Sequence, residues 1–231
     1  MNDHAANEEH LESSDFISDI VIGISDGLTV PFALAAGLVS AVDSNLIITT
    51  AGIAEIAAGS IAMGLGGYLA GRTEIDHYKS ELKREYEEVE IYPDKERQEV
   101  MDVFEEYGIS KELQVAVADE MSKDKDQWVR FMMRFELGLE EPHPKRAVRS
   151  ALNIGVAYIV GGLIPMIPYF ITETPLEGLQ WSTIITVVCL AIFGYFKSKV
   201  TGQPLWVGTL KVVVIGVLAA GAAFAIASLL S

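Results

Sequence analysis

The distribution of charge along the chain constrains its fold more than any other feature of the sequence. Five long segments are apolar and almost free of charge, at about 18–41, 46–71, 147–171, 181–200 and 204–230. Each reaches the roughly 20 residues that a helix needs to cross a hydrocarbon core of about 30 Å. Backbone amides and carbonyls find no water there, so these segments must be helices. The sequence therefore predicts an all-α integral membrane protein with five transmembrane helices.

The charged residues lie almost entirely outside these segments. Residues 1–19 and 72–149 hold 27 of the 32 acidic residues and 14 of the 17 Lys and Arg residues. A net charge of −15 disfavours a nucleic-acid partner, because phosphate binding needs a basic surface. A single cysteine, Cys189, excludes an internal disulfide framework and a Cys-rich zinc site. Membrane lipid is the expected surrounding of the apolar segments.

The segregation of charge divides the chain into four parts. We expect a disordered acidic N-terminus, a hairpin of the first two spans, an inserted helical domain and the last three spans, at 1–17, 18–71, 72–146 and 147–231. Turn signals punctuate the third part, and helix-like stretches lie between them, near 72–91, 94–107, 110–122 and 124–140. The first of these stretches continues the second span beyond the membrane.

The orientation follows from the Lys and Arg residues of the connections, which favour the cytosolic side. The connections at 43–45 and 172–178 have none, whereas 72–149 has fourteen and 197–203 has two. With five spans, the N-terminus and the inserted domain are predicted to be cytosolic. The C-terminus is then on the opposite side.

Three side chains in the first two spans can carry chemistry inside the membrane, where an ionisable group is costly and marks an ion pathway by default. Asp26 and Met63 each lie about 12 Å from the cytosolic ends of their spans, at a rise of 1.5 Å per residue. Glu55 lies two turns beyond Met63, toward the outside. The alternatives are that Asp26 caps a broken helix at Gly27 and that Glu55 is neutral and hydrogen-bonded.

The inserted domain contains a second set of candidate ligands. Two Glu-x-x-Glu pairs place carboxylates on one helix face, and a later stretch adds two thioethers and a carboxylate. The residues are Glu85, Glu88, Glu96, Glu99, Met132, Met133 and Glu136. Carboxylates mixed with thioethers suit a first-row transition metal better than calcium or magnesium. The alternative is a solvated acidic helix with Met132 in a small core.

Two Glu-x-x-His stretches, Glu74 to His77 and Glu140 to His143, offer a different class of function. Paired motifs of this kind build di-iron carboxylate sites in helical bundles. Pro142 lies inside the second stretch and disfavours a regular helix there. A di-iron oxidase is therefore the weaker alternative.

Five spans are few to enclose a pathway within one chain, and the second span is rich in small residues. Gly67-x-x-x-Gly71 is one pattern that permits close helix approach. A pathway between two identical subunits, with the small-residue face of the second span near the two-fold axis, is the simpler geometry. The sequence therefore predicts a homodimer.

Three runs of the chain resemble the vacuolar iron transporter family. Two resemble its first and second spans, and the third resembles the end of its cytosolic domain. They are Asp26–Leu38 (DGLTVPFALAAGL), Ala51–Gly64 (AGIAEIAAGSIAMG) and Phe131–Glu140 (FMMRFELGLE). The resemblance covers essentially residues 15–230, with the same order of elements.

This resemblance implies a dimer with five spans per subunit and a cytosolic three-helix metal-binding domain. It implies export of ferrous iron from the cytosol, with manganese as a second ion and protons moving the other way, and neither enzymatic activity nor a prosthetic group. Asp26, Glu55 and Met63 match the family's translocation path. Its metal-collecting positions match Glu85, Glu88, Glu96, Glu99, Met132, Met133 and Glu136.

The expected membrane is vacuolar in a eukaryote and the cell membrane in a prokaryote. The sequence leaves one alternative to transport open, which is a membrane-anchored metal buffer or sensor.

Overall fold

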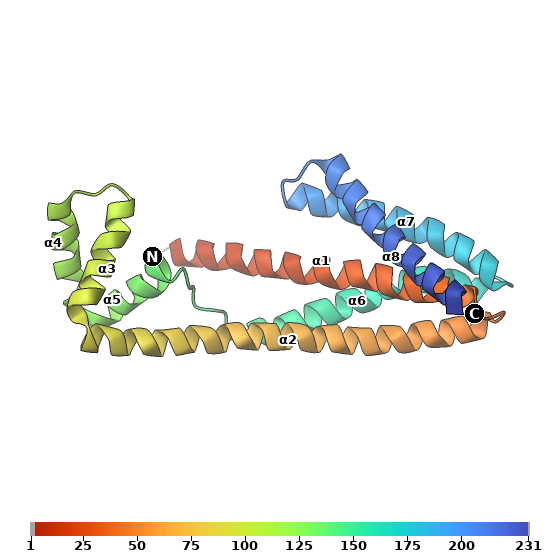
Figure 1. Ribbon diagram of the computed structural model, residues 1–231, viewed down its shortest axis with the longest axis horizontal. Coiled ribbons are helices and arrows are strands. Elements are labelled where there is room, and N and C mark those ends of the chain that lie inside the picture. The colour runs from red at the N-terminus through yellow and green to blue at the C-terminus, as the bar shows by residue number, and fades with distance from the viewer. Residues whose placement is uncertain (1–2, 231) are drawn as a thin grey trace. The chain divides into compact units, whose positions relative to one another are not determined.

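The computed structural model describes residues 3–230 and the side chains of 15–229, and the regular secondary structure in that range is helical (Figure 1). The chain divides into two compact units. One consists of Met1–Leu69 with Ala147–Ser231, and the other of Ala70–Arg146. The long helix α2 (Asn45–Ile91) begins in the first unit and ends in the second.

The first unit holds five helices that are long and apolar enough to cross a membrane, which confirms the predicted number of spans. They are α1 (Asp3–Val39), α2, α6 (Arg146–Ile171), α7 (Pro175–Val200) and α8 (Leu205–Leu230). Large apolar side chains such as Leu69, Val156 and Leu218 are exposed on these helices. Such exposure fits contact with lipid, because a soluble protein rarely exposes large contiguous apolar surface.

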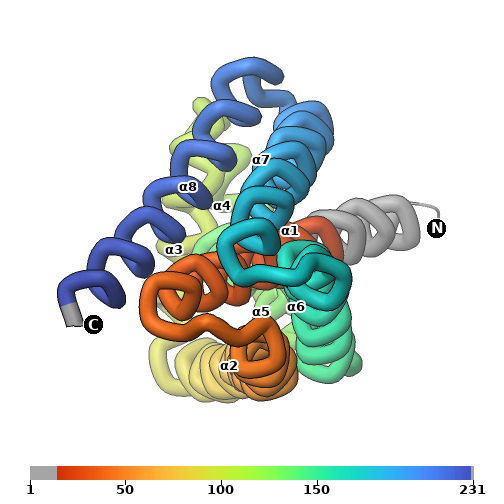
Figure 2. Tube along the Cα trace, turned by 90° about the vertical axis from the view of Figure 1, so that its right-hand side faces the viewer, coloured from red at the N-terminus to blue at the C-terminus, as the bar shows by residue number. Residues whose placement is uncertain are grey.

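Helix α6 lies against both α1 and α2, and small residues make this packing close. A Cβ added at Gly23 or Gly27 of α1 would lie 2.5 or 2.4 Å from a backbone carbonyl oxygen of α6. A Cβ added at Gly64 of α2 would lie 2.9 Å from the carbonyl oxygen of Ala151. Figure 2 shows α6 beside α1 and α2, with α7 and α8 packed on another side of α1. Small residues therefore bring α1 and α2 close to α6.

Two helix starts differ from the boundaries that we predicted. Helix α7 begins at Pro175 rather than near 181, because Thr174 accepts a hydrogen bond from the Glu177 amide at 3.3 Å and Pro175 occupies the first helical position. Helix α1 begins at Asp3 and includes most of the stretch 1–17, for which we expected disorder. Ala, Glu and Leu in that stretch are good helix formers.

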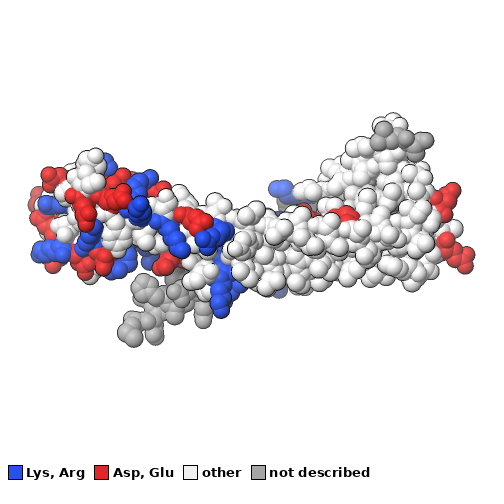
Figure 3. Space-filling view, turned by 90° about the horizontal axis from the view of Figure 1, so that it is seen from below, with Lys and Arg blue, Asp and Glu red and all other residues white. Residues whose placement is uncertain are grey.

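The second unit is built from the end of α2 and a run of shorter helices. These are α3 (Pro93–Glu106), α4 (Lys111–Met121), α5 (Lys125–Phe131) and the π-helix η1 (Met132–Glu136). Their core contains Val100, Trp128 and Val129, whereas charged side chains crowd the surface (Figure 3). The domain is thus a small helical fold whose positions match the four predicted helix-like stretches.

The last predicted stretch, 124–140, ends earlier than expected. The regular structure stops at Glu136, and Gly138 adopts a left-handed conformation with φ +63°. Before it stops, the helix widens. The Leu137 amide donates to the Met132 carbonyl, five residues back, at 3.1 Å. Such π-turns are rare and occur frequently at functional sites.

Candidate metal sites

Five carboxylates of the second unit come together as two overlapping triads. In each triad, one oxygen from every member lies within 4.8 Å of the others. One triad consists of Glu85, Glu88 and Glu96, and the other of Glu96, Glu99 and Glu136. Glu96 belongs to both. The structure thus gathers all five glutamates predicted from the sequence into one cluster, which we call the carboxylate cluster.

The centre of the carboxylate cluster is buried and short of partners. Glu85 is 1% exposed and Glu96 is 0% exposed. Both carboxylate oxygens of Glu96 and one of Glu85 are buried without a hydrogen-bond partner. Buried anionic oxygens without partners carry a desolvation cost that a cation or a proton relieves. The donor set therefore fits a divalent metal ion.

The carboxylates hold their protons more tightly than ordinary glutamates. Burial, followed by the adjacent carboxyl group of Glu96, raises the pKa of Glu85 to about 8. Glu136 is exposed as a residue, but desolvation of its carboxyl end and the charge of Glu99 and Glu96 raise its pKa to about 7. Burial also raises the pKa of Glu96. A metal ion that binds these oxygens must therefore displace protons.

Lys95 lies at the edge of the carboxylate cluster. Its Nζ is 2.7 Å from Glu99 Oε1 and 3.6 Å from Glu96 Oε1. The hydrogen bond to Glu99 raises the pKa of Lys95 above its usual value. Lys95 is itself exposed, so a bound metal ion can displace its ammonium group into solvent at little cost.

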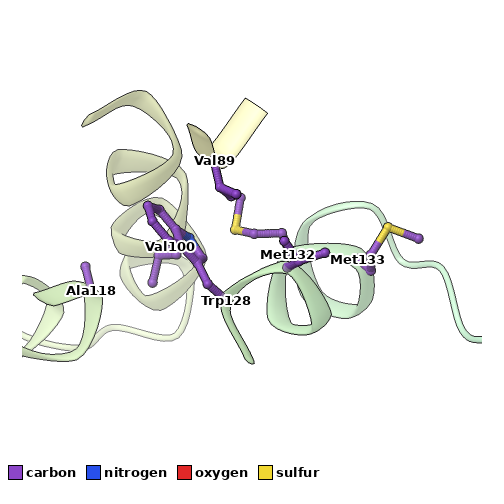
Figure 4. Packing of buried hydrophobic residues seen from close by; sticks show 7 residues of the cluster. Val89, Val100, Ala118, Trp128, Met132 and Met133 are labelled. Carbon is purple, nitrogen blue, oxygen red and sulfur yellow. The ribbon is translucent and has the colours of Figure 1, made fainter. Parts of the chain in front are cut away.

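The two methionines of the predicted ligand set belong to the hydrophobic core. Met132 is 0% exposed and Met133 is 1% exposed. Figure 4 shows the Met132 side chain directed toward Val89 and the Met133 side chain directed away from it. Both methionines lie on η1, the same short helix that carries Glu136 of the carboxylate cluster. Their role as ligands stays a prediction.

We predict opposite pH dependences for the metal-free and metal-bound protein. The pKa of Glu85 is 4.5 in the unfolded chain and about 8 in the folded protein. Between these two pH values the folded protein keeps a proton on Glu85 that the unfolded chain has lost. Without metal, the stabilising contribution is therefore fully present below pH 4.5 and is lost as the pH rises to about 8. With metal bound the pH dependence is opposite, and stability rises with pH, because the metal ion must displace these protons to bind.

The measurement is the thermal unfolding midpoint of the full chain in detergent, with EDTA or with Mn²⁺, at about pH 6 and about pH 8.5. The stabilisation by Mn²⁺ should be larger at the higher pH. A larger stabilisation at the lower pH contradicts the predicted competition.

The spans contain the second candidate site. Asp26 on α1 and Glu55 and Met63 on α2 are all half-buried. Helix α1 runs unbroken through Gly27, so the alternative in which Asp26 caps a broken helix is wrong. The Glu55 carboxylate accepts a hydrogen bond from the hydroxyl of Tyr158 on α6. Of the alternative in which Glu55 is neutral and hydrogen-bonded, the hydrogen bond is therefore confirmed, and the neutral state stays a prediction.

Tyr158 lies where the three helices meet. A Cβ at Gly27 would lie 2.4 Å from the Tyr158 carbonyl oxygen, and a Cβ at Gly59 would lie 2.5 Å from its hydroxyl. Gly27 and Gly59 therefore both pack against Tyr158, from two different spans. Asp26, next to Gly27 on α1, lies within electrostatic range of Tyr158. The similar depth of Asp26 and Met63 stays a prediction.

Two features of the spans were not predicted from the sequence. One is Tyr158, which is 103 positions from Glu55 along the chain. The other is Asp19, which we counted with the charged N-terminus although it is only 3% exposed. Asp19 accepts hydrogen bonds from Ser150 Oγ at 2.9 Å and Asn153 Nδ2 at 3.2 Å. Asp19 lies seven residues before Asp26 and therefore on the same helix face. This spacing could have identified Asp19 from the sequence as a buried residue of the span.

The residues of the predicted di-iron motifs do not come together. Among the described residues, the acidic and histidine groups close enough to share an ion include neither His77 nor His143. Glu74 pairs with Arg146 at 3.8 Å, and His77 lies 3.9 Å from Glu81. Residues 138–143 have no regular secondary structure, as Pro142 led us to expect.

The fold and the two carboxylate sites define a multi-pass α-helical membrane protein with acidic side chains inside its spans. The VIT family profile matches residues 17–228 of the chain. Because this match covers most of the chain, the protein belongs to the VIT family.

Named relatives extend the match over nearly the whole length. The chain is 45% identical to Vacuolar iron transporter 1 of Oryza sativa over 224 residues, covering 97% of this chain and 89% of the relative. It is 48% identical to Vacuolar iron transporter 1 of Arabidopsis thaliana over 220 residues, or 95% and 88% of the two chains. It is 41% identical to Protein CCC1 of Saccharomyces cerevisiae over 223 residues, or 93% and 69%. The plant relatives are named as transporters, in agreement with the expectation that this chain is not an enzyme.

Proposed function

We propose that the protein carries ferrous iron, with Mn²⁺ as a second ion, out of the cytosol across its membrane in exchange for protons. The observation that carries this proposal is a pair of half-buried carboxylates on two different spans, Asp26 on α1 and Glu55 on α2, of which Glu55 accepts a hydrogen bond from Tyr158. Charged groups inside a membrane are expensive and mark ion paths. The relatives named vacuolar iron transporters support iron as the ion.

The proposed path uses the three predicted side chains in order. Asp26 and Met63 receive the ion at the inner mouth, where a carboxylate and a thioether favour a first-row transition metal over calcium. Glu55 then exchanges the metal ion for a proton. A carboxylate in a desolvated position can alternate between these two states, and this alternation couples the two fluxes.

The second unit supplies the ion in this proposal. Its carboxylate cluster, with Met132 and Met133 as further ligands, concentrates divalent metal on the cytosolic side. The distribution of Lys and Arg supports a cytosolic N-terminus and a cytosolic second unit. We further propose a homodimer with α2 near the two-fold axis, because small residues such as Ala54, Ala58 and Gly66 are exposed along this helix. The names of the plant relatives, vacuolar iron transporters, support a vacuolar membrane in a eukaryotic cell.

The test is ion uptake into liposomes that contain the whole chain, under an imposed pH gradient. Uptake of Fe²⁺, kept reduced under nitrogen, should rise above that of empty liposomes and should collapse when the gradient is removed. Mn²⁺ should also enter, whereas Ca²⁺ should not. Fe²⁺ uptake that is the same with and without the pH gradient contradicts proton exchange.

The carboxylate cluster also favours a second candidate function, a membrane-anchored metal buffer or sensor. Buried oxygens without partners can bind a metal ion whether or not the spans conduct one. This candidate predicts metal binding by the purified chain and no uptake by the liposomes. The same preparation therefore separates the two functions.

A further inference from the structure

The two oxygens of the Glu55 carboxylate have different surroundings. Oε1 accepts the hydrogen bond from the Tyr158 hydroxyl, whereas Oε2 is buried and has no hydrogen-bond partner in the described part of the chain. A carboxylate in solution offers both oxygens equally. Here one oxygen is held by a phenol and the other remains available to an ion that passes along the spans.

The surroundings of Tyr158 hold its hydroxyl in place. Tyr158 is only 2% exposed. Its backbone is fixed by the close packing of Gly27, and its hydroxyl lies over Gly59, one helical turn from Glu55. No larger residue fits at position 59 without a shift, because a Cβ there would lie 2.5 Å from the hydroxyl and 2.6 Å from the ring carbon that bears it. A glycine at this position therefore makes the contact between Tyr158 and Glu55 possible.

We propose that Tyr158 is a specificity-determining residue that occupies one oxygen of Glu55, so that this carboxylate meets a passing cation with a single oxygen. The inference rests on the proposed transport function and adds a basis for ion choice. Ca²⁺ takes six to eight oxygen ligands and readily binds both oxygens of one carboxylate. A single oxygen, with the thioether of Met63 on the same face of α2, suits a smaller transition-metal ion better.

The experiment measures competition rather than uptake alone. Liposomes that contain the whole chain take up Fe²⁺ under nitrogen and ascorbate, and Ca²⁺ is added at increasing concentration. In Tyr158→Phe the ring remains and both oxygens of Glu55 become free. The Ca²⁺ concentration that halves Fe²⁺ uptake should fall by about tenfold relative to the wild type, as expected for one additional ligand oxygen.

Tyr169→Phe is the matched control, because Tyr169 is also on α6, is also 2% exposed and belongs to an apolar core cluster. Its competition curve should equal that of the wild type. A loss of packing alone would affect both variants, whereas a freed Glu55 oxygen affects only the first.

A second variant keeps the inference testable if Tyr158→Phe folds poorly. Glu55→Asp retains the carboxylate but shortens the side chain by one methylene group, so that it falls short of the Tyr158 hydroxyl. Ca²⁺ should compete more strongly in this variant too, and adding Tyr158→Phe to it should change the curve no further.

The outcomes separate the inference from the function on which it rests. If the wild type takes up Fe²⁺ and Ca²⁺ competes equally in the wild type, Tyr158→Phe and Glu55→Asp, the role of Tyr158 in ion choice is overturned. If the wild type takes up no ion, the proposed function is overturned and the inference falls with it.

Discussion

Replacement of Glu55 by Gln should abolish the proton flux that a metal gradient drives through this protein. Gln has nearly the same shape and can still accept the hydrogen bond from Tyr158. It can neither release a proton nor present a negative charge to a cation. If Glu55 exchanges metal for proton, the substitution removes the exchanging group and leaves the helix packing unchanged.

The measurement uses liposomes with a pH-sensitive dye inside and Fe²⁺ added outside. In the wild type, entry of Fe²⁺ should change the internal pH, and in Glu55→Gln the signal should match that of empty liposomes. Uptake of Fe²⁺ itself should fall by about 100-fold, the equivalent of roughly 3 kcal/mol of lost interaction with the ion.

The matched control is Glu177→Gln, which makes the same chemical change at an exposed glutamate in the first turn of α7. This variant should retain full proton flux and full uptake. If Glu55→Gln also retains coupled flux, Glu55 is not the site of exchange. In that case Asp26 is the remaining carboxylate of the proposed path.

Much of the fold could be predicted because a membrane imposes strong rules on a sequence. Five segments almost free of charge form five helices, and a short connection at 40–44, close to the predicted 43–45, separates α1 from α2. The errors lie at helix ends. The Thr174-Pro175 start was mistaken for a turn, although Thr, Pro and Glu in this order also begin helices. Local composition cannot separate a turn from a helix start when both use the same residues.

The carboxylate cluster could be predicted because its members repeat at helical spacing. Glu85 and Glu88 share a face of α2, as do Glu96 and Glu99 on α3. What spacing could not show is that the faces meet, since this depends on the connection at Tyr92 and on packing around Val100. The resemblance to a known family supplied that information.

Tyr158 could not be predicted, for a physical reason. A lone tyrosine in a span is most simply an interfacial or packing residue. Its bond to Glu55 requires Gly27 and Gly59 to admit α6 closely on two sides, and these contacts join parts of the chain more than 90 residues apart. The glycines were visible in the sequence, but their partner was not.

Glu96→Gln is expected to have the largest effect on metal binding by the second unit. Glu96 is the one residue common to both triads, it is 0% exposed, and both of its oxygens lack a hydrogen-bond partner. Its loss removes an anionic ligand from two places at once. The affinity of the full chain for Mn²⁺ should fall by about 100-fold, which corresponds to about 3 kcal/mol.

The same substitution should stabilise the metal-free protein, because it removes a buried negative charge beside Glu85. Titration calorimetry measures the first effect and the thermal unfolding midpoint in EDTA measures the second. Glu106→Gln, at an exposed position near the end of α3, controls for the change of charge on this helix. It should leave both quantities unchanged.

Transport by Glu96→Gln distinguishes a domain that supplies the ion from a domain that gates its flow. If the carboxylate cluster only concentrates metal, uptake should fall at low Fe²⁺ and recover fully at saturating Fe²⁺, because the path through Asp26, Glu55 and Met63 is intact. The concentration for half-maximal uptake rises and the maximal rate does not change. A lower maximal rate at every Fe²⁺ concentration contradicts the role of a supplier, because a vacant cluster then closes a path whose own ligands are present. Liposome uptake measured across Fe²⁺ concentrations, with Glu106→Gln alongside, decides between the two roles.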